Sequence, residues 1–206
     1  MWVRIPPWAQ MVKKLPEIYH SPLLAYIVGI ALGDGNLSNP NGRATRLRIT
    51  CDLKYLKLIQ KIQASLAILL PQNKVSIVKR PEKCIDLSCY SNKWKNILEW
   101  SANKGSKLIQ GVPVPNWIKI NHEYEINCLR GLIETDGSIY SDRKYRAVML
   151  TNASYNLAKD VFQIMISLGF RPRFYTLSNG GDRIIYRVRV ATNVDTFLEL
   201  IKPEKK

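Results

Sequence analysis

The sequence predicts an α+β protein made of two similar halves, because one pattern of helix, strands and helices occurs twice along the chain. Segments 26–35 (YIVGIALGDG) and 128–137 (CLRGLIETDG) align at an offset of 102 residues, and each ends in an Asp-Gly pair. A strand-like run and an amphipathic helix follow each segment. At 206 residues, the chain is long enough for one large domain or for two of about 100 residues, and either could bury a core.

The elements of each half follow from the spacing of apolar residues and from turn and cap residues. In the first half we expect a helix to Asp34, a turn at 39–42, a strand at 46–50, a helix after Asp52, strands at 74–79 and 85–90, and a helix at 94–100. In the second half we expect a helix to Asp136, a turn at 141–144, a strand at 146–151, a helix from Asn152 or Ser154 to Gly169, strands at 171–177 and 184–191, and a helix at 194–201. The Asn-Gly-Gly-Asp run at 179–182 is a strong hairpin signal.

The segment between the halves is polar and interrupted by prolines, as is typical of a linker. We therefore expect an N-terminal arm at 1–21, a first half at 22–104, a linker at 105–122 and a second half at 123–206. Trp2 and Trp8 are candidates for packing the arm on the core.

The charge balance indicates a polyanionic partner. The chain has 31 Lys and Arg residues against 16 Asp and Glu, which gives a formal charge of +15 and a pI near 9.8. A basic ribosomal-type or thermophile protein would share this charge but would not explain the internal duplication. Nucleic acid is therefore the expected partner.

Several other classes are disfavoured. The four cysteines form no C-x-x-C pair and the two histidines are far apart, so neither a zinc site nor a disulfide framework is expected. Residues 1–21 lack the pattern of a signal peptide, and the longest apolar run, 23–32, is about half of a membrane span. We expect a protein with no membrane partner that is not secreted and is located inside the cell, in the cytoplasm, the nucleoid or an organelle matrix.

Small residues recur on one face of the two repeated segments. Gly29 and Gly33 lie four residues apart, and Gly131 and Thr135 hold the same places in the second copy. Such a face lets two helices approach more closely than the usual 8–10 Å. The simplest use of these four residues is an interface between the two repeated helices.

That packing would bring Asp34 and Asp136 together at the C-terminal ends of the helices. The helix dipoles and the opposite carboxylate both disfavour negative charge there, so the pair needs a cation. Mg²⁺, or Mn²⁺, suits hard oxygen ligands and bridges to phosphate oxygens. The alternative is that each Asp-Gly pair only ends a helix, but two matching copies in matching contexts disfavour it.

At these residues the chain resembles the LAGLIDADG family of homing endonucleases, closely at 129–137 and more loosely at 27–35. The resemblance covers most of residues 22–201. It implies two αββαββα halves whose antiparallel sheets form a saddle over DNA, with the motif helices at the interface. It also implies metal binding by Asp34 and Asp136 as catalytic residues, aided by the backbone oxygens of Gly33 and Thr135.

The chain departs from the family pattern at two places. The sixth motif position is Glu134 in the second copy but Leu32 in the first. Family members also place a basic or amide residue near the central waters, where this chain has Cys51 and Asp52, then Asn152 and Ala153. Lys107 and Lys93 are the candidates for a peripheral catalytic residue.

Alternation along the expected strands separates a basic face from an apolar one. Arginine on such strands can read guanine in the major groove, although any one of them can instead contact phosphate or solvent. The candidate DNA-binding residues are Arg43, Arg46, Arg48, Lys74, Ser76, Arg80, Arg146, Arg171, Arg173, Arg183, Arg187 and Arg189.

The function implied by the resemblance is site-specific cleavage of both strands of double-stranded DNA. An intron RNA maturase, or a non-catalytic DNA-binding protein on the same fold, is the alternative. We expect a monomer, because one chain carries both halves. Residue types do not specify the target sequence, which depends on side-chain geometry and DNA bending.

Overall fold

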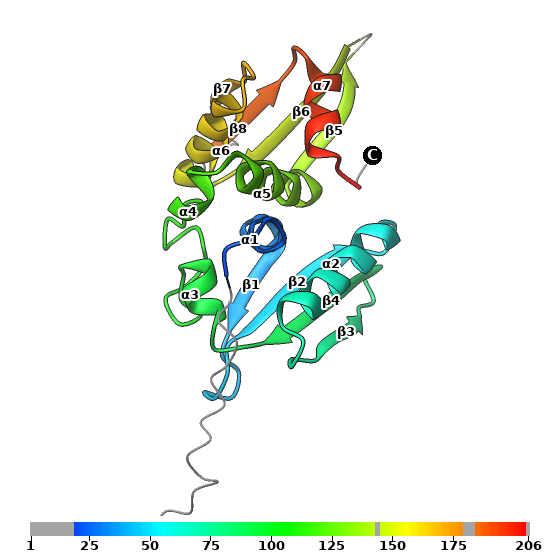
Figure 1. The fold of residues 1–206 in the computed structure, drawn as a ribbon, viewed down its shortest axis with the longest axis vertical. Helices are drawn as coiled ribbons and strands as arrows, with labels where there is room; N and C mark the ends of the chain where they lie inside the picture. The colour runs from blue at the N-terminus through cyan, green and yellow to red at the C-terminus, as the bar shows by residue number, and fades with distance from the viewer. Residues whose placement is uncertain (1–18, 143–144, 179–183, 205–206) are drawn as a thin grey trace, which may run out of the picture.

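The computed structural model describes residues 19–142, 145–178 and 184–204, and these form two halves with one order of elements (Figure 1). The first half contains α1 (Pro22–Asp34), β1 (Gly35–Ser38), β2 (Arg46–Asp52), α2 (Leu56–Leu69), β3 (Val75–Lys79), β4 (Cys84–Tyr90) and α3 (Trp94–Leu98). After α4 (Asn116–Lys119), the second half contains α5 (His122–Thr135), β5 (Gly137–Asp142), β6 (Tyr145–Asn152), α6 (Tyr155–Ser167), β7 (Arg173–Ser178), β8 (Ile184–Val190) and α7 (Val194–Ile201). The expected α+β class and the αββαββα order are confirmed.

Each half has one antiparallel sheet of four strands, in the orders β1-β2-β4-β3 and β5-β6-β8-β7. The first strand of each sheet begins at the glycine of the Asp-Gly pair, where Gly35 pairs with Ile49 and Gly137 pairs with Leu150. In both halves the Asp-Gly pair therefore leads directly from the motif helix into the first strand.

Side-chain caps start both motif helices. The Ser21 hydroxyl accepts a hydrogen bond from the Leu24 amide at 3.1 Å, and Pro22 occupies the first turn of α1. Asn121 caps α5 by accepting hydrogen bonds from the amides of Glu123 and Tyr124. These caps fix where each helix begins.

Helix α1 is buried continuously from Leu24 to Leu32, as expected for a helix that is apolar all round. It lies side by side with α5 between the two sheets (Figure 1). Helix α2 packs on the first sheet and helix α6 packs on the second sheet. The buried core on the helix-covered faces of the two sheets includes Ile49 and Leu150. The centre of the molecule is thus the contact between the two motif helices.

Some expectations are not tested by this structure. Trp2, Trp8, Arg183 and the hairpin at 179–182 lie outside the described residues. The boundaries placed at residues 21, 104 and 122 stay predictions. Within the described part of the chain, no helix is long and apolar enough to span a bilayer.

Candidate metal centre and nucleic-acid interface

The two motif helices meet at their glycines. A Cβ atom on Gly29 would lie 2.1 Å from the Cys128 carbonyl oxygen, and one on Gly131 would lie 2.5 Å from the Tyr26 carbonyl oxygen. Real side chains do not approach backbone this closely. The backbones of α1 and α5 are therefore in direct contact, at a distance that only glycine allows.

Gly33 and Thr135 face each other at the C-terminal end of the contact between α1 and α5. A Cβ on Gly33 would lie 2.0 Å from the Thr135 hydroxyl oxygen. That hydroxyl is also 2.9 Å from the Gly131 carbonyl oxygen and 3.1 Å from the Leu132 carbonyl oxygen, within its own helix. Threonine thus fits in place of a second glycine because the residue opposite has no side chain.

Asp34 and Asp136 each follow this Gly33–Thr135 contact by one residue, so the helix pair brings both carboxylates to one end. Asp34 is exposed and Asp136 is half-buried. The Asn152 side-chain amide donates a hydrogen bond to Asp136 at 2.7 Å, while its oxygen accepts one from the Ser154 amide at 2.8 Å. Asn152, at the end of β6, therefore holds the Asp136 carboxylate in place.

Lys107 reaches the same end of the helix pair from the connection between the halves. Its ammonium donates to the carbonyl oxygens of Ala31, Leu32 and Gly33, at 2.9, 2.7 and 2.5 Å. Burial lowers the pKa of Lys107 to about 8, although the negative charges of Asp136 and Asp34 act in the opposite direction. The structure therefore places this candidate beside both acids.

The loop that carries Lys107 is held by one glutamine. The Gln110 side chain accepts a hydrogen bond from the Ser101 amide and donates to the carbonyl oxygens of Ser101 and Gly105. The Asn156 side chain of α6 donates to the Gly111 carbonyl at 2.9 Å. These contacts fix the loop against the second half.

The other basic candidate, Lys93, was a wrong prediction for this site. It lines a surface hollow together with Tyr19 and Ser21, beside the N-terminal end of α1. Asp34 ends this helix of 13 residues, so the two ends are roughly 18 Å apart at 1.5 Å per residue. Strand β4 runs away from the acids before α3 begins, which is why Lys93 cannot reach them.

The oxygen ligands at this end of the helices fit a hard divalent cation. Two carboxylates and the backbone oxygens beside them resemble the ligand set of Mg²⁺, which keeps several waters and binds phosphate. Among the described residues, no group of three His, Cys, Asp or Glu side chains could hold a metal.

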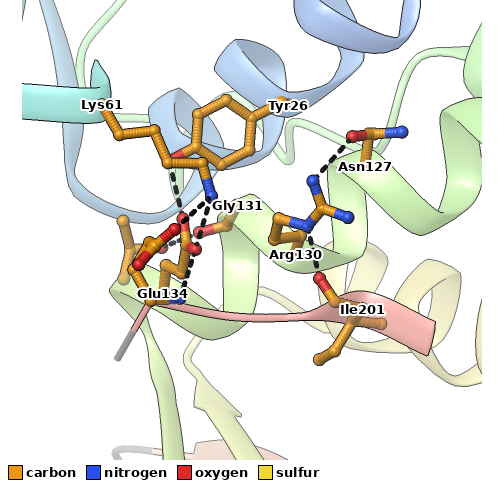
Figure 2. A network of polar contacts seen from close by, with 9 residues as sticks. Tyr26, Lys61, Asn127, Arg130, Gly131, Glu134 and Ile201 are labelled. Carbon is orange, nitrogen blue, oxygen red and sulfur yellow. Dashed lines mark hydrogen bonds and ion pairs between the residues drawn. The ribbon is translucent and has the colours of Figure 1, made fainter. Parts of the chain in front are cut away.

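Glu134, the extra acid of the second motif, belongs to a separate buried network (Figure 2). Its carboxylate accepts hydrogen bonds from the Tyr26 hydroxyl at 2.6 Å, the Lys61 ammonium at 3.1 Å and the Glu204 amide at 2.8 Å. Burial and the neighbouring Glu134 charge raise the pKa of Tyr26. Glu134 thus ties α5 to α1, to α2 and to the segment after α7, a role that the sequence did not indicate.

On the first sheet, Arg46, Arg48 and Thr50 share the face opposite to the buried Leu47 and Ile49. The pairing of Arg48 with Ser88, and of Ser88 with Ser76, puts Ser76 on this same face. The Arg48 Nε is buried and donates to no acceptor within the described ranges. The face that helices do not cover is thus polar and basic.

Arg80 also lies on this face, but it is engaged by a residue that sequence reasoning missed. The Arg80 Nε donates to the Asp86 carboxylate at 2.6 Å, and Thr50 donates to it at 2.7 Å. Burial raises the pKa of Asp86, but these two hydrogen bonds outweigh burial and hold the pKa below its usual value. Only the strand register, which places Asp86 opposite Thr50, reveals this contact.

On the second sheet, the uncovered face is more basic. Arg187 lies opposite Thr151 and Tyr175, while Arg189 lies directly opposite Arg173. The Arg189 guanidinium also lies over the Tyr140 ring, 5.9 Å from its centre. Like charges directly opposite each other are unfavourable, so Arg173 and Arg189 are suited to an anionic partner.

Arg146 was wrongly assigned to the DNA-binding face. It lies in phase with the buried Val148 and Leu150, on the side of the sheet that α7 covers. Its guanidinium pairs with Asp195 of α7 at 2.8 Å. The remaining candidates, Arg43, Lys74 and Arg171, are exposed residues just outside the strands.

Comparison with known proteins finds a family model that matches the second half of the chain, and similar folds among solved structures. Residues 123–202 match the family model described as LAGLIDADG-like domain. The chain is 27% identical over 174 residues, 76% of its length, to the ribonucleoside-diphosphate reductase NrdEB subunit alpha of Bacillus subtilis (strain 168), and equally to that of Bacillus phage SPbeta. The chain spans only 15% of the length of these relatives.

Among solved structures, the homing endonuclease I-DmoI in complex with DNA and Mn is similar in fold. It matches with a TM-score of 0.66 and 20% identity, over 87% of this chain and 96% of that one. Full-length DUF199/WhiA from Thermatoga maritima matches with a TM-score of 0.60 and 13% identity, over 91% of this chain and 57% of that one. The likeness in fold therefore extends over both halves of the described chain.

Proposed function

We propose that this chain is a single-chain, two-motif member of the LAGLIDADG family and that it hydrolyses both strands of a long DNA target with a divalent metal ion. The observation that carries the proposal is the meeting of Asp34 and Asp136 at one end of the packed motif helices. A nuclease of this kind needs one acid for each strand, and both acids are present.

The proposed mechanism assigns a role to each residue at this end of the helices. Asp34 and Asp136 would hold Mg²⁺ or Mn²⁺, with the backbone oxygen of Thr135 beside them, while the Gly33 oxygen accepts a hydrogen bond from Lys107. A bound divalent ion would activate water and stabilise the leaving oxygen of each strand. Asn152 orients Asp136, and Lys107 supplies positive charge beside both carboxylates.

The uncovered sheet faces would hold the DNA. Double-stranded DNA carries one negative charge per about 1.7 Å of its axis, which matches two sheets whose free faces present arginines. We propose that Arg48, Arg187 and Arg189 contact bases or phosphates, while Arg80 stays bound to Asp86. I-DmoI, which is similar in fold, has been solved in complex with DNA and Mn, and this supports DNA as the partner.

The alternatives differ in what they require of the two acids. A non-catalytic DNA-binding protein on this fold would not need Asp34 and Asp136, whose packing and orientation favour the enzyme. No feature of the described residues favours intron RNA as the partner. The resemblance to the reductase subunits covers one segment of those proteins, so we propose no reductase activity.

Selection from a random DNA library tests this function directly. The purified protein is incubated with duplexes of random sequence and Mg²⁺, and molecules cut on both strands are recovered and sequenced. We expect a long, specific target sequence and no products when EDTA removes the metal. Recovery of no cut molecules with Mg²⁺ or Mn²⁺ would contradict the proposal and favour a non-catalytic binder.

The basic faces give a second test, through the salt dependence of binding. We expect Arg187→Ala or Arg189→Ala to weaken the binding of a DNA duplex and to lower the slope of log K against log salt by about 1, as for one lost phosphate contact. Fluorescence anisotropy at several salt concentrations measures both quantities.

Arg146→Ala is the matched control, because Arg146 lies on the covered face and pairs with Asp195. Its affinity and salt slope should equal those of the unmodified protein. If Arg146→Ala weakened binding as much as Arg187→Ala, the assignment of the DNA-binding face would be wrong.

A further inference from the structure

The two motif helices end differently, although their sequences are similar. At the end of α5, the Thr135 hydroxyl lies within hydrogen-bond distance of the carbonyl oxygens of Gly131 and Leu132. At the end of α1, Gly33 has no side chain, and the Lys107 ammonium binds the terminal carbonyls instead. The first motif therefore has a cation at its end that is supplied by the chain itself.

The ammonium of Lys107 is fully engaged by these contacts. A lysine has three N–H donors, and each of three carbonyl oxygens lies within 2.9 Å of the nitrogen. The negative end of the helix dipole favours a cation at this position. The arrangement is thus a charge-matched site for one positive ion at the end of α1.

The position of the Lys107 ammonium affects which oxygen atoms are available to a divalent metal ion. Gly33 is the residue whose backbone oxygen would help to hold a divalent ion at the first motif, and the Lys107 nitrogen lies 2.5 Å from that oxygen. A divalent ion and an ammonium repel each other, and both need the same oxygen. They therefore cannot share it.

We propose that Lys107 is a built-in cation that takes the place of a divalent ion at the terminal carbonyls of α1 and weakens metal binding by the Asp34–Asp136 pair. The inference rests on the proposed metal site. A metal held there would use the two carboxylates and the second motif, without the Gly33 oxygen. The two strands of DNA would then meet unequal halves of the site.

The alternative role for Lys107 is only to hold the loop at 101–111 in place. The two roles predict opposite effects on metal binding. If Lys107 competes with metal, its removal strengthens binding, because the carboxylates lose a neighbouring positive charge. If Lys107 only holds the loop, its removal leaves metal binding unchanged or weakens it.

Titration with Mn²⁺ alone distinguishes the two roles of Lys107. The electron paramagnetic resonance signal of free Mn²⁺ measures how much of the ion is bound. We expect Lys107→Met to bind Mn²⁺ at least about tenfold more tightly than the unmodified protein, as the loss of one nearby charge predicts. Lys107→Arg, which keeps the charge, should bind as weakly as the unmodified protein. Lys104→Met, an exposed lysine of the same loop, is the matched control and should change nothing.

Two further variants make the result specific. In Asp34→Asn/Lys107→Met, the gain in Mn²⁺ affinity should disappear. If Lys107→Met does not fold, Lys107→Gln is titrated in its place, with the same expected gain. Thermal unfolding gives an independent readout, because Mn²⁺ should raise the Tm of Lys107→Met more than that of the unmodified protein.

Unchanged or weaker Mn²⁺ binding by Lys107→Met and Lys107→Gln would overturn this inference and leave the metal site standing. An absence of saturable Mn²⁺ binding in every variant would overturn both the inference and the proposed metal site. DNA cleavage enters neither readout, so the outcome does not depend on knowing the target.

Discussion

Replacing Asp34 or Asp136 by asparagine is expected to lower the rate of DNA cleavage by at least about a thousandfold, as the loss of several kcal/mol of metal-ion stabilisation predicts. Asparagine keeps the size of the side chain but removes the charge that a divalent ion needs. DNA affinity should change little, because the carboxylates face metal rather than bases. Cleavage of a plasmid carrying the selected target measures the rate, and nicked and linear products report the two strands separately.

Asp195→Asn is the matched control for this pair. Asp195 is an exposed carboxylate of α7 that pairs with Arg146 at 2.8 Å, on the helix-covered side of the second sheet and away from the two motif aspartates. This variant should cleave both strands at the unmodified rate. Full activity in Asp34→Asn or Asp136→Asn would contradict the metal assignment, whereas equal losses in Asp195→Asn would point to a general effect of surface charge.

The order of elements could be predicted from the sequence because most elements carry their own pattern. The long helices and the central strands have regular apolar spacing, and their repetition at a fixed offset strengthened each assignment. Strand β1 was not expected from its residues alone, because its four residues are too few and too polar to form a pattern. It forms because the sheet supplies a partner in β2.

The first residues of α2 and α6 show how far a helix cap can be predicted from the sequence. Asp52 was expected to cap α2, but its carboxylate accepts from the Lys54 amide in a turn, and α2 begins later, at Leu56. In the second half, Ser154 caps α6 by accepting from the Leu157 amide, while Asn152 turns toward Asp136. The cap was predictable in type, but the partner of each side chain depends on the tertiary structure.

The candidate site was likewise predictable from the sequence only in part. The acids and the small residues were visible in the sequence because they repeat within a motif. The partners of Arg80 and Arg146 were not, since they depend on strand register and on which helix covers the sheet. The choice between Lys107 and Lys93 depends on the path of a loop that Gln110 holds, and no periodicity encodes that path.

Gly29→Ala is expected to destabilise the protein by about 3 kcal/mol or more, at the upper end of the range for overpacking. Helix propensity alone predicts the opposite, since Ala is favoured over Gly by about 1 kcal/mol in a helix interior. The new methyl group would lie 2.1 Å from the Cys128 carbonyl oxygen, which belongs to a helix backbone and cannot move by rotation of a side chain. The steric cost of the new methyl group therefore exceeds the gain in helix propensity, and α1 and α5 must separate.

Thermal unfolding measures this effect, and a fall in Tm of roughly 6–12 °C is expected for a protein of this size. Ala64→Gly, on the exposed face of α2, is the control for helix propensity and should cost only about 1 kcal/mol. Gly33→Ala should be rescued by Thr135→Gly, because the atoms that it meets belong to the Thr135 side chain. Gly29→Ala has no such rescue, since backbone lies opposite. If Gly29→Ala proved as stable as the unmodified protein, α1 and α5 could not be in backbone contact, and the close approach of Asp34 and Asp136 would lose its structural basis.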